Sequence, residues 1–198
     1  MDRRDLARLL SSTVEAPAEE VRGGTRWQWA PHIAPRAFTH LLYHGLFPEA
    51  QGEAQARYEP FDTGDRLAYL QEFNGLHAFN GFLSVRGFGP YPAGDMGQPV
   101  YLDYGNWVER APSLDAQDLC VAAMTGSFLS ADVVLDRHGR ARLVHSGTGE
   151  VGAEWPSLRE FLTSEVLRLG SLHDRQGRPL VSLHELWPDG AVGWDGPA

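Results

Sequence analysis

Two histidines four residues apart, His40 and His44, have a spacing that could support metal binding. If both lay on one helix they would face the same side, as paired metal ligands do. A metal site also needs a third ligand, and His32 precedes Pro35 without a fixed geometry. No His-Glu-x-x-His pattern completes the set. We therefore expect no metal site and no cofactor.

The other candidate catalytic residues stand without a supporting motif. Cys120 lies in the apolar run Leu119–Met124, so we expect a buried, inert thiol. The glycine-rich stretch Ser146–Glu150 has no lysine, and we expect a turn rather than a phosphate loop. Asp132 and Asp136 are better explained as structural carboxylates than as a catalytic dyad. The sequence thus predicts no catalytic residue and a protein that is not an enzyme.

Composition limits the classes of partner. The 198 residues carry a formal net charge of -9, which disfavours a nucleic-acid backbone and fits a basic protein partner. All 17 basic residues are arginines, so Schiff-base chemistry on lysine is excluded. No stretch approaches the roughly 20 apolar residues that span a bilayer. With a single cysteine and no apolar signal region, we expect a cytoplasmic protein that binds no membrane.

The first third of the chain is predicted to contain short helices and a strand, joined by polar connections. Apolar spacing predicts a helix over residues 2–14 and another over residues 36–46. Residues 15–24 are predicted as a linker and residues 48–62 as a polar connection. Trp27-Gln28-Trp29 alternates as a strand does.

The central segment combines a helix, a forced stop and a strand. Apolar residues at helical spacing over 67–73 predict the helix. Asn74-Gly75 ends it, because both residues tolerate the left-handed conformation, and we expect a positive φ at one of them. A second pair, Asn80-Gly81, turns the chain into a short strand. We predict structural roles for both Asn-Gly pairs.

A helix is most clearly marked near the C-terminal end. Ser157 and Glu160 form a capping-box pattern, which gives both a structural role. Apolar residues then recur on one face up to Leu169, and Gly170 is the expected helix end. Residues 131–145 read as a β-hairpin. Helices, short antiparallel strands and a long helix in this order predict an α+β fold.

Several of these segments resemble the SUKH superfamily, the group of bacterial toxin-immunity proteins and fungal cell-wall regulators. Phe73-Asn74-Gly75-Leu76 is followed by Phe-x-Gly-x-Leu-x-Val-x-Gly over residues 79–87. The hairpin over 131–145 resembles the closing hairpin of the family's sheet, and a terminal helix with an Asp-x-x-Gly turn at 174–177 follows in the family's order. The resemblance covers residues 27–180 in patches.

The resemblance implies a mostly antiparallel sheet with helices packed on one face. We predict an N-terminal helix and linker over residues 1–24, a SUKH-like domain over 25–186 and a loose tail over 187–198. It also implies a non-catalytic protein-binding domain, an immunity protein that neutralises a cognate bacterial toxin by direct binding. The alternatives are a small-ligand sensor with a pocket between sheet and helices, and an enzyme whose site the sequence does not reveal.

The expected partner-binding segment is residues 88–118, which are rich in proline, glycine, acidic and aromatic residues. Aromatic anchors supply much of the energy of a protein interface, and surrounding charge steers the encounter. The alternative is that the aromatic residues are core and the acids solvate a loop. In the resembling family this region often contains an acidic or polar stretch ending in Asn, and residues 103–106 stand in that place here. The predicted partner-binding residues are Asp103, Tyr104, Asn106, Trp107 and Glu109.

Overall fold

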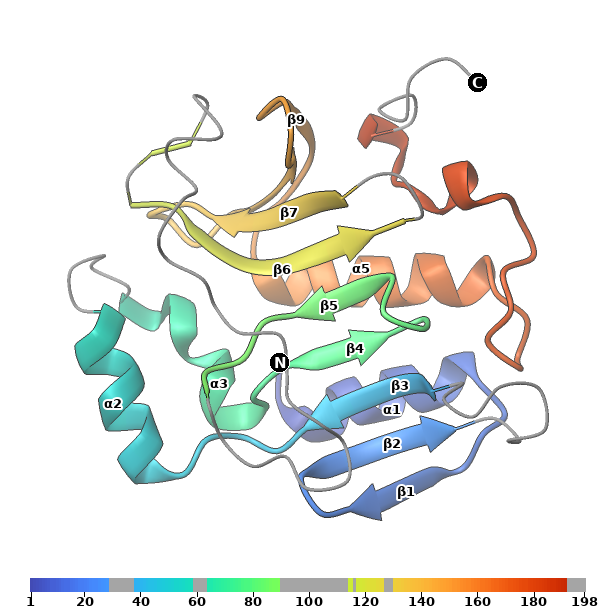
Figure 1. The fold of residues 1–198 in the computed structure, drawn as a ribbon, viewed down its shortest axis with the longest axis horizontal. Helices are drawn as coiled ribbons and strands as arrows, with labels where there is room; N and C mark the ends of the chain where they lie inside the picture. The colour runs from blue at the N-terminus through green and yellow to red at the C-terminus, as the bar shows by residue number, and fades with distance from the viewer. Residues whose placement is uncertain (29–37, 59–63, 90–113, 116, 127–129, 192–198) are drawn as a thin grey trace.

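Strands that are neighbours in the sequence pair antiparallel throughout, and the described strands build one nine-stranded sheet in the order β1 to β9 (Figure 1). The computed structural model describes residues 1–28, 38–58, 64–89, 114–115, 117–126 and 130–191. The strands are β1 (Ala18–Val21), β2 (Gly24–Gln28), β3 (Phe38–Tyr43), β4 (Leu76–Ala78), β5 (Leu83–Val85), β6 (Leu119–Thr125), β7 (Ser130–Leu135), β8 (Ala141–His145) and β9 (Val151–Trp155).

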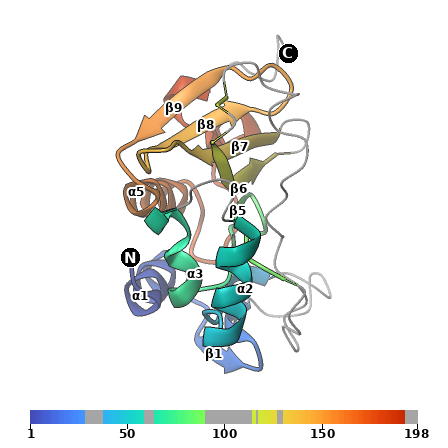
Figure 2. The ribbon, with the colours of Figure 1, turned by 90° about the vertical axis from the view of Figure 1, so that its left-hand side faces the viewer.

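Two helices lie side by side on one face of this sheet, α1 (Arg3–Thr13) and α5 (Leu158–Ser171) (Figures 1 and 2). Leu6 and Phe161, one from each helix, are fully buried in the main core. The predicted α+β fold, with a mostly antiparallel sheet and helices on one face, is confirmed. The shorter elements are α2 (Pro48–Tyr58), α3 (Tyr69–Glu72) and the 3-10 turns η2 (Gly64–Leu67), η4 (Leu183–Leu186) and η5 (Asp189–Ala191).

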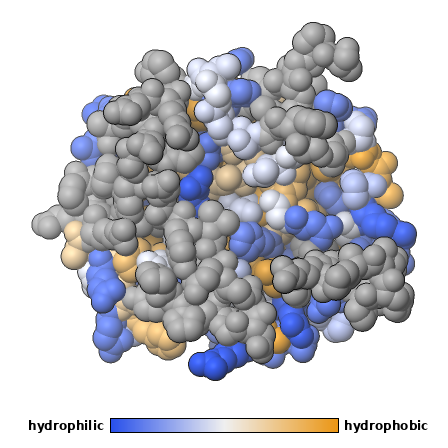
Figure 3. Space-filling model, in the orientation of Figure 1, coloured by the Kyte–Doolittle hydropathy of each residue, from blue (hydrophilic) through white to orange (hydrophobic). Residues whose placement is uncertain are grey.

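The central strands bury side chains on both faces, because successive residues of a strand point to opposite sides. Val133 belongs to the main core under the helices. Its neighbour Val134 belongs to a second cluster with Cys120 and Val144. The sheet face opposite the helices is turned to the viewer in Figure 3, where hydrophobic and hydrophilic surfaces lie next to each other among the described residues.

The start of α5 agrees with the sequence. Ser157 is the N-cap, and its hydroxyl oxygen accepts a hydrogen bond from the backbone N–H of Glu160 at 3.2 Å. Trp155 packs edge-to-face on Phe161 with ring centroids 4.9 Å apart. Only half of the predicted capping box forms, because the Glu160 carboxylate accepts no hydrogen bond from the backbone N–H of Ser157 in the described structure.

Gly170 does not end α5, because the helix continues to Ser171 with Leu172 as C-cap. The prediction of a stop at this glycine is wrong. A Cβ at Gly170 would lie 2.5 Å from Thr13 Cγ2 and 3.0 Å from Thr13 Cβ. Gly170 therefore allows α1 and α5 to approach closely, rather than supplying a left-handed helix end.

The helix predicted over residues 36–46 is also wrong, because these residues contain strand β3. Leu42 packs in the main core, whereas Leu41 and Tyr43 form a cluster on the other face. A strand buried on both faces has a continuous apolar run, and such a run can resemble a helix in sequence.

Two segments predicted without regular structure contain some. Residues 15–24 include strand β1, which pairs along its length with β2 in the same sheet. Residues 48–62 include helix α2, which begins at Pro48, a favoured residue for a first helical turn. Ala50 and Ala54 of this helix are buried, and their small side chains give only a weak apolar pattern.

The central helix is shorter than predicted, with η2 and α3 in place of one continuous helix and Phe73 extended at φ -151°. The glycine of the first Asn-Gly pair, Gly75, has φ 111°, so the positive φ predicted for that pair is at the glycine. Asn80 and Gly81 have φ 55° and 86°. Both pairs therefore turn the chain, the first into β4 and the second into β5.

The segment predicted as a loose tail starts inside the core. Trp187 is buried and packs edge-to-face on Phe82 with ring centroids 5.3 Å apart. Ala191 is also buried. Residues 192–198 lie outside the described residues.

Replacing Gly170 by Ala should destabilise the protein, although Ala is preferred to Gly inside a helix by about 0.5–1 kcal/mol. The new methyl group would press on Thr13, and we expect a net loss of about 1–3 kcal/mol in the free energy of unfolding. Urea denaturation would measure it. Thr13→Ser, which removes the γ-methyl group and keeps the hydroxyl, should reduce the effect of Gly170→Ala. A stabilised Gly170→Ala protein would contradict this close packing.

Stability should fall as the pH drops below about 6.5, the ordinary pKa of histidine. Burial lowers the pKa of His77 and of His173, and His173 also packs on Phe79. Between the folded and unfolded pKa values, the unfolded chain binds more protons, so acid favours unfolding. Urea titrations at pH 7.5 and 5.5 should give a lower free energy of unfolding at the lower pH. Equal values would show that neither histidine is buried in its neutral form.

Candidate functional site

The predicted partner-binding residues Asp103, Tyr104, Asn106, Trp107 and Glu109 lie outside the described residues. Their role in partner binding stays a prediction. The structure describes the two ends of the segment that contains them, residues 86–89 and 114–118 without Ala116.

This segment connects two strands that are direct neighbours in the sheet. Leu83 of β5 pairs with Met124 of β6, and Val85 pairs with Ala122. A simple hairpin would connect such strands with about 2–5 residues. Here residues 86–118 make the connection. The chain therefore leaves the sheet beside the place where it returns, and we call residues 86–118 the insertion.

Asn74 holds the departing end of the insertion. Its side-chain Nδ2 donates a hydrogen bond to Phe88 O at 2.9 Å, and its Oδ1 accepts one from Phe88 N at 2.6 Å. The amide thus pairs with the backbone as a neighbouring strand would. A Cβ on Gly87 would lie 2.4 Å from Asn74 O, so glycine is needed for this close approach. The sequence predicted a structural role for Asn74 but not this partner.

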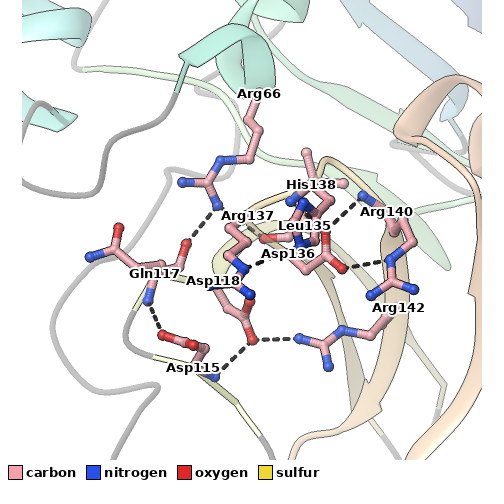
Figure 4. Close-up of polar contacts among 10 residues, drawn as sticks. All are labelled: Arg66, Asp115, Gln117, Asp118, Leu135, Asp136, Arg137, His138, Arg140 and Arg142. Carbon is pink, nitrogen blue, oxygen red and sulfur yellow. Dashed lines mark hydrogen bonds and ion pairs between the residues drawn. The ribbon is translucent and has the colours of Figure 1, made fainter.

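The returning end is held by charged groups from two other elements (Figure 4). Arg66 of η2 donates from Nη1 to the backbone oxygen of Gln117 at 2.6 Å. Asp118 accepts hydrogen bonds from Arg142 of β8 and from the backbone N–H of Asp115. Burial raises the pKa of Asp118, although Arg142 and the Asp115 N–H act in the opposite direction.

The carboxylates of Asp132 and Asp136 have separate partners. Asp132 accepts hydrogen bonds from Arg86 at 3.0 Å and from the Ser146 hydroxyl at 2.6 Å. Asp136 accepts two from Arg140, from its backbone N–H at 3.0 Å and from Nε at 2.8 Å. Burial alone would raise the pKa of Asp136, but its hydrogen bonds hold that pKa below the ordinary value. Both carboxylates therefore have structural partners in the strands and turns around them.

The thiol of Cys120 is buried next to Asp132. Burial raises the pKa of this thiol well above its ordinary value, so it stays protonated at neutral pH. Because the thiolate is the nucleophile in cysteine chemistry, the environment matches the predicted inert thiol.

His40 and His44 lie on and just after a strand, so the helical spacing of a metal-ligand pair does not apply. The Nδ1 atom of His40 accepts a hydrogen bond from the backbone N–H of Phe79 at 3.2 Å. Its Nε2 atom therefore carries the proton and donates to the Thr13 hydroxyl oxygen at 3.0 Å. Burial lowers the pKa of the more exposed His44, whose Nε2 is 3.9 Å from a Glu20 carboxylate oxygen.

A cavity of about 700 Å³ opens between α3, the β7–β8 turn and the start of α5. A small-ligand sensor, an alternative that the sequence left open, would need a pocket of this kind. Leu135 and Leu162 line its floor. The described lining includes the charged side chains of Arg66, Glu72, Arg137 and Arg159 and the imidazole of His138.

No model of a known protein family, no curated protein and no solved structure matches this chain. None of the helices in the described residues has the length and apolar character needed to cross a bilayer.

Replacing Asn74 by Ala should remove both hydrogen bonds that its amide makes with the buried backbone of Phe88. We expect a loss of about 2–4 kcal/mol in the free energy of unfolding, measured by urea denaturation. Asn74→Asp is the matched control, since its carboxylate accepts from Phe88 N but repels Phe88 O. Its stability should recover partly in mild acid, where the carboxyl group can donate. An Asn74→Ala protein of unchanged stability would show that this amide does not hold the insertion.

Proposed function

We propose that this chain is a non-catalytic protein-binding domain, and that it neutralises a cognate bacterial toxin in the manner of the SUKH immunity proteins it resembles. The insertion is the binding segment. It starts and ends at neighbouring strands, and Asn74 and Arg66 hold its two ends. This anchored insertion carries the proposal, because binding residues are often found on loops that a rigid scaffold positions.

The composition of the insertion supports a basic protein as partner. Five acidic residues of the insertion, Asp95, Asp103, Glu109, Asp115 and Asp118, stand against the two basic residues Arg86 and Arg110. Its aromatic residues are Phe88, Tyr91, Tyr101, Tyr104 and Trp107. A net charge of -9 on the whole chain adds a long-range attraction for a basic partner.

The first experiment tests whether the purified chain captures the product encoded beside its own gene and blocks the toxicity of that product. Once a partner is in hand, its association should slow as the salt concentration rises, because long-range attraction is screened. Failure to bind or protect against that product would reject the proposed pairing.

Charge reversal then tests the binding segment. Asp103→Arg with Glu109→Arg should reduce the on-rate about tenfold or more at low salt and should weaken its salt dependence. Glu49→Arg with Glu150→Arg makes the same change in net charge at exposed positions outside the insertion. That control should retain most of the on-rate. Equal kinetics for both double variants would place the interface elsewhere.

A further inference from the structure

We propose that the cavity between α3, the β7–β8 turn and α5 binds a small, multiply charged anion that carries a phosphate group. This inference concerns a second site and does not depend on the proposed protein partner. The cavity volume of about 700 Å³ lies within the roughly 300–1,000 Å³ typical of small-molecule pockets.

The described part of the lining carries more basic than acidic side chains, unlike the chain as a whole. Arg66, Arg137 and Arg159 line the cavity together with His138, and Glu72 is the acidic residue of the described lining. The whole chain, in contrast, has 26 acidic and 17 basic residues. A cavity lined by positive charge raises the local concentration of small anions, even when the protein as a whole is acidic.

Two of these arginines are available to a ligand. Most described arginines form an ion pair with a carboxylate, as Arg86 does with Asp132 and Arg142 with Asp118. Arg137 and Arg159 are exposed and form no ion pair with a carboxylate of the described residues. A guanidinium group presents a planar set of donors that matches phosphate oxygens in pairs.

Hydrogen bonds to neighbouring residues orient two of the cavity's arginine side chains, Arg66 and Arg137. Arg66 is buried, and its hydrogen bonds to Gln117 O and Leu135 O hold its guanidinium in place (Figure 4). Arg137 Nε donates to His138 Nε2 at 3.2 Å, so the imidazole accepts at that atom. The Arg66 guanidinium is therefore held in place, whereas the exposed Arg137 and Arg159 can contact the anion.

The remaining lining provides a surface for the organic part of the ligand. Pro156 and Leu158 lie beside Arg159 at the start of α5 and are exposed or half-buried. The hydroxyl oxygen of Ser157 already accepts a hydrogen bond as the cap of α5. The arginine side chains therefore supply the hydrogen bonds that select an anion over a neutral ligand. Positive charge next to apolar surface favours a phosphorylated organic molecule over a bare ion.

The test uses isothermal titration of the free protein with ADP, inorganic pyrophosphate and adenosine at constant ionic strength. We expect saturable binding of ADP and pyrophosphate, tighter for ADP, and none of adenosine. Arg137→Ala and Arg159→Ala should each weaken ADP binding about tenfold, as loss of a charged hydrogen bond does. Arg22→Ala removes an exposed arginine outside the cavity and should leave binding unchanged.

Two results would overturn this inference. One is the lack of saturable binding of ADP and pyrophosphate up to about 10 mM, which is weaker than ordinary ligand affinities. The other is equal loss of binding in Arg22→Ala and in the two cavity variants. The titration contains no protein partner, so its failure leaves the proposed toxin binding intact. A failed toxin assay likewise leaves the anion titration valid.

Discussion

The two halves of the sheet are joined by a short ladder between β5 and β6, whose residue pairs are Leu83 with Met124, Ser84 with Ala123 and Val85 with Ala122. Hydrogen bonds from Arg86 N to Val121 O and from Thr125 N to Phe82 O, both 2.8 Å, extend this ladder. Because the ladder fixes both ends of the insertion, the register of two strands determines where the proposed binding segment leaves and returns. Asn74 and Arg66 then hold those ends from outside the ladder.

The parts of the fold that sequence could predict are those with local signals. Ser157 can be predicted as the N-cap of α5 because the signal for it lies within one helical turn of the sequence. Strand β3 has the apolar pattern of a helix in the sequence, because Leu41 and Leu42 are both buried, on opposite faces of the sheet. Helix α2 has no clear apolar pattern in the sequence, because the buried side chains of Ala50 and Ala54 are small and hardly raise the local hydrophobicity.

The candidate sites depend on long-range contacts, so the sequence revealed less of them. The acidic and aromatic content of the insertion is visible in the chain, but the pairing of β5 with β6 is not. The neighbouring Gly75 indicates a structural role for Asn74 in the sequence. The hydrogen bond from Asn74 to Phe88 can be seen only in the folded structure. Arg66, Arg137 and Arg159 come from η2, the β7–β8 turn and α5. Only the tertiary structure brings these three positive charges to one cavity.

The packing of α1 on α5 also has a consequence for how the chain folds during synthesis. Leu6 and Leu10 of α1 are fully buried, yet the helix packed beside them is made only after all nine described strands. At about 5–20 residues per second, a ribosome needs on the order of ten seconds to cover that distance. During that time α1 exposes apolar side chains beside a growing sheet. The main core can therefore close only after α5 has emerged, and it is completed by Trp187 and Ala191 still later in the chain.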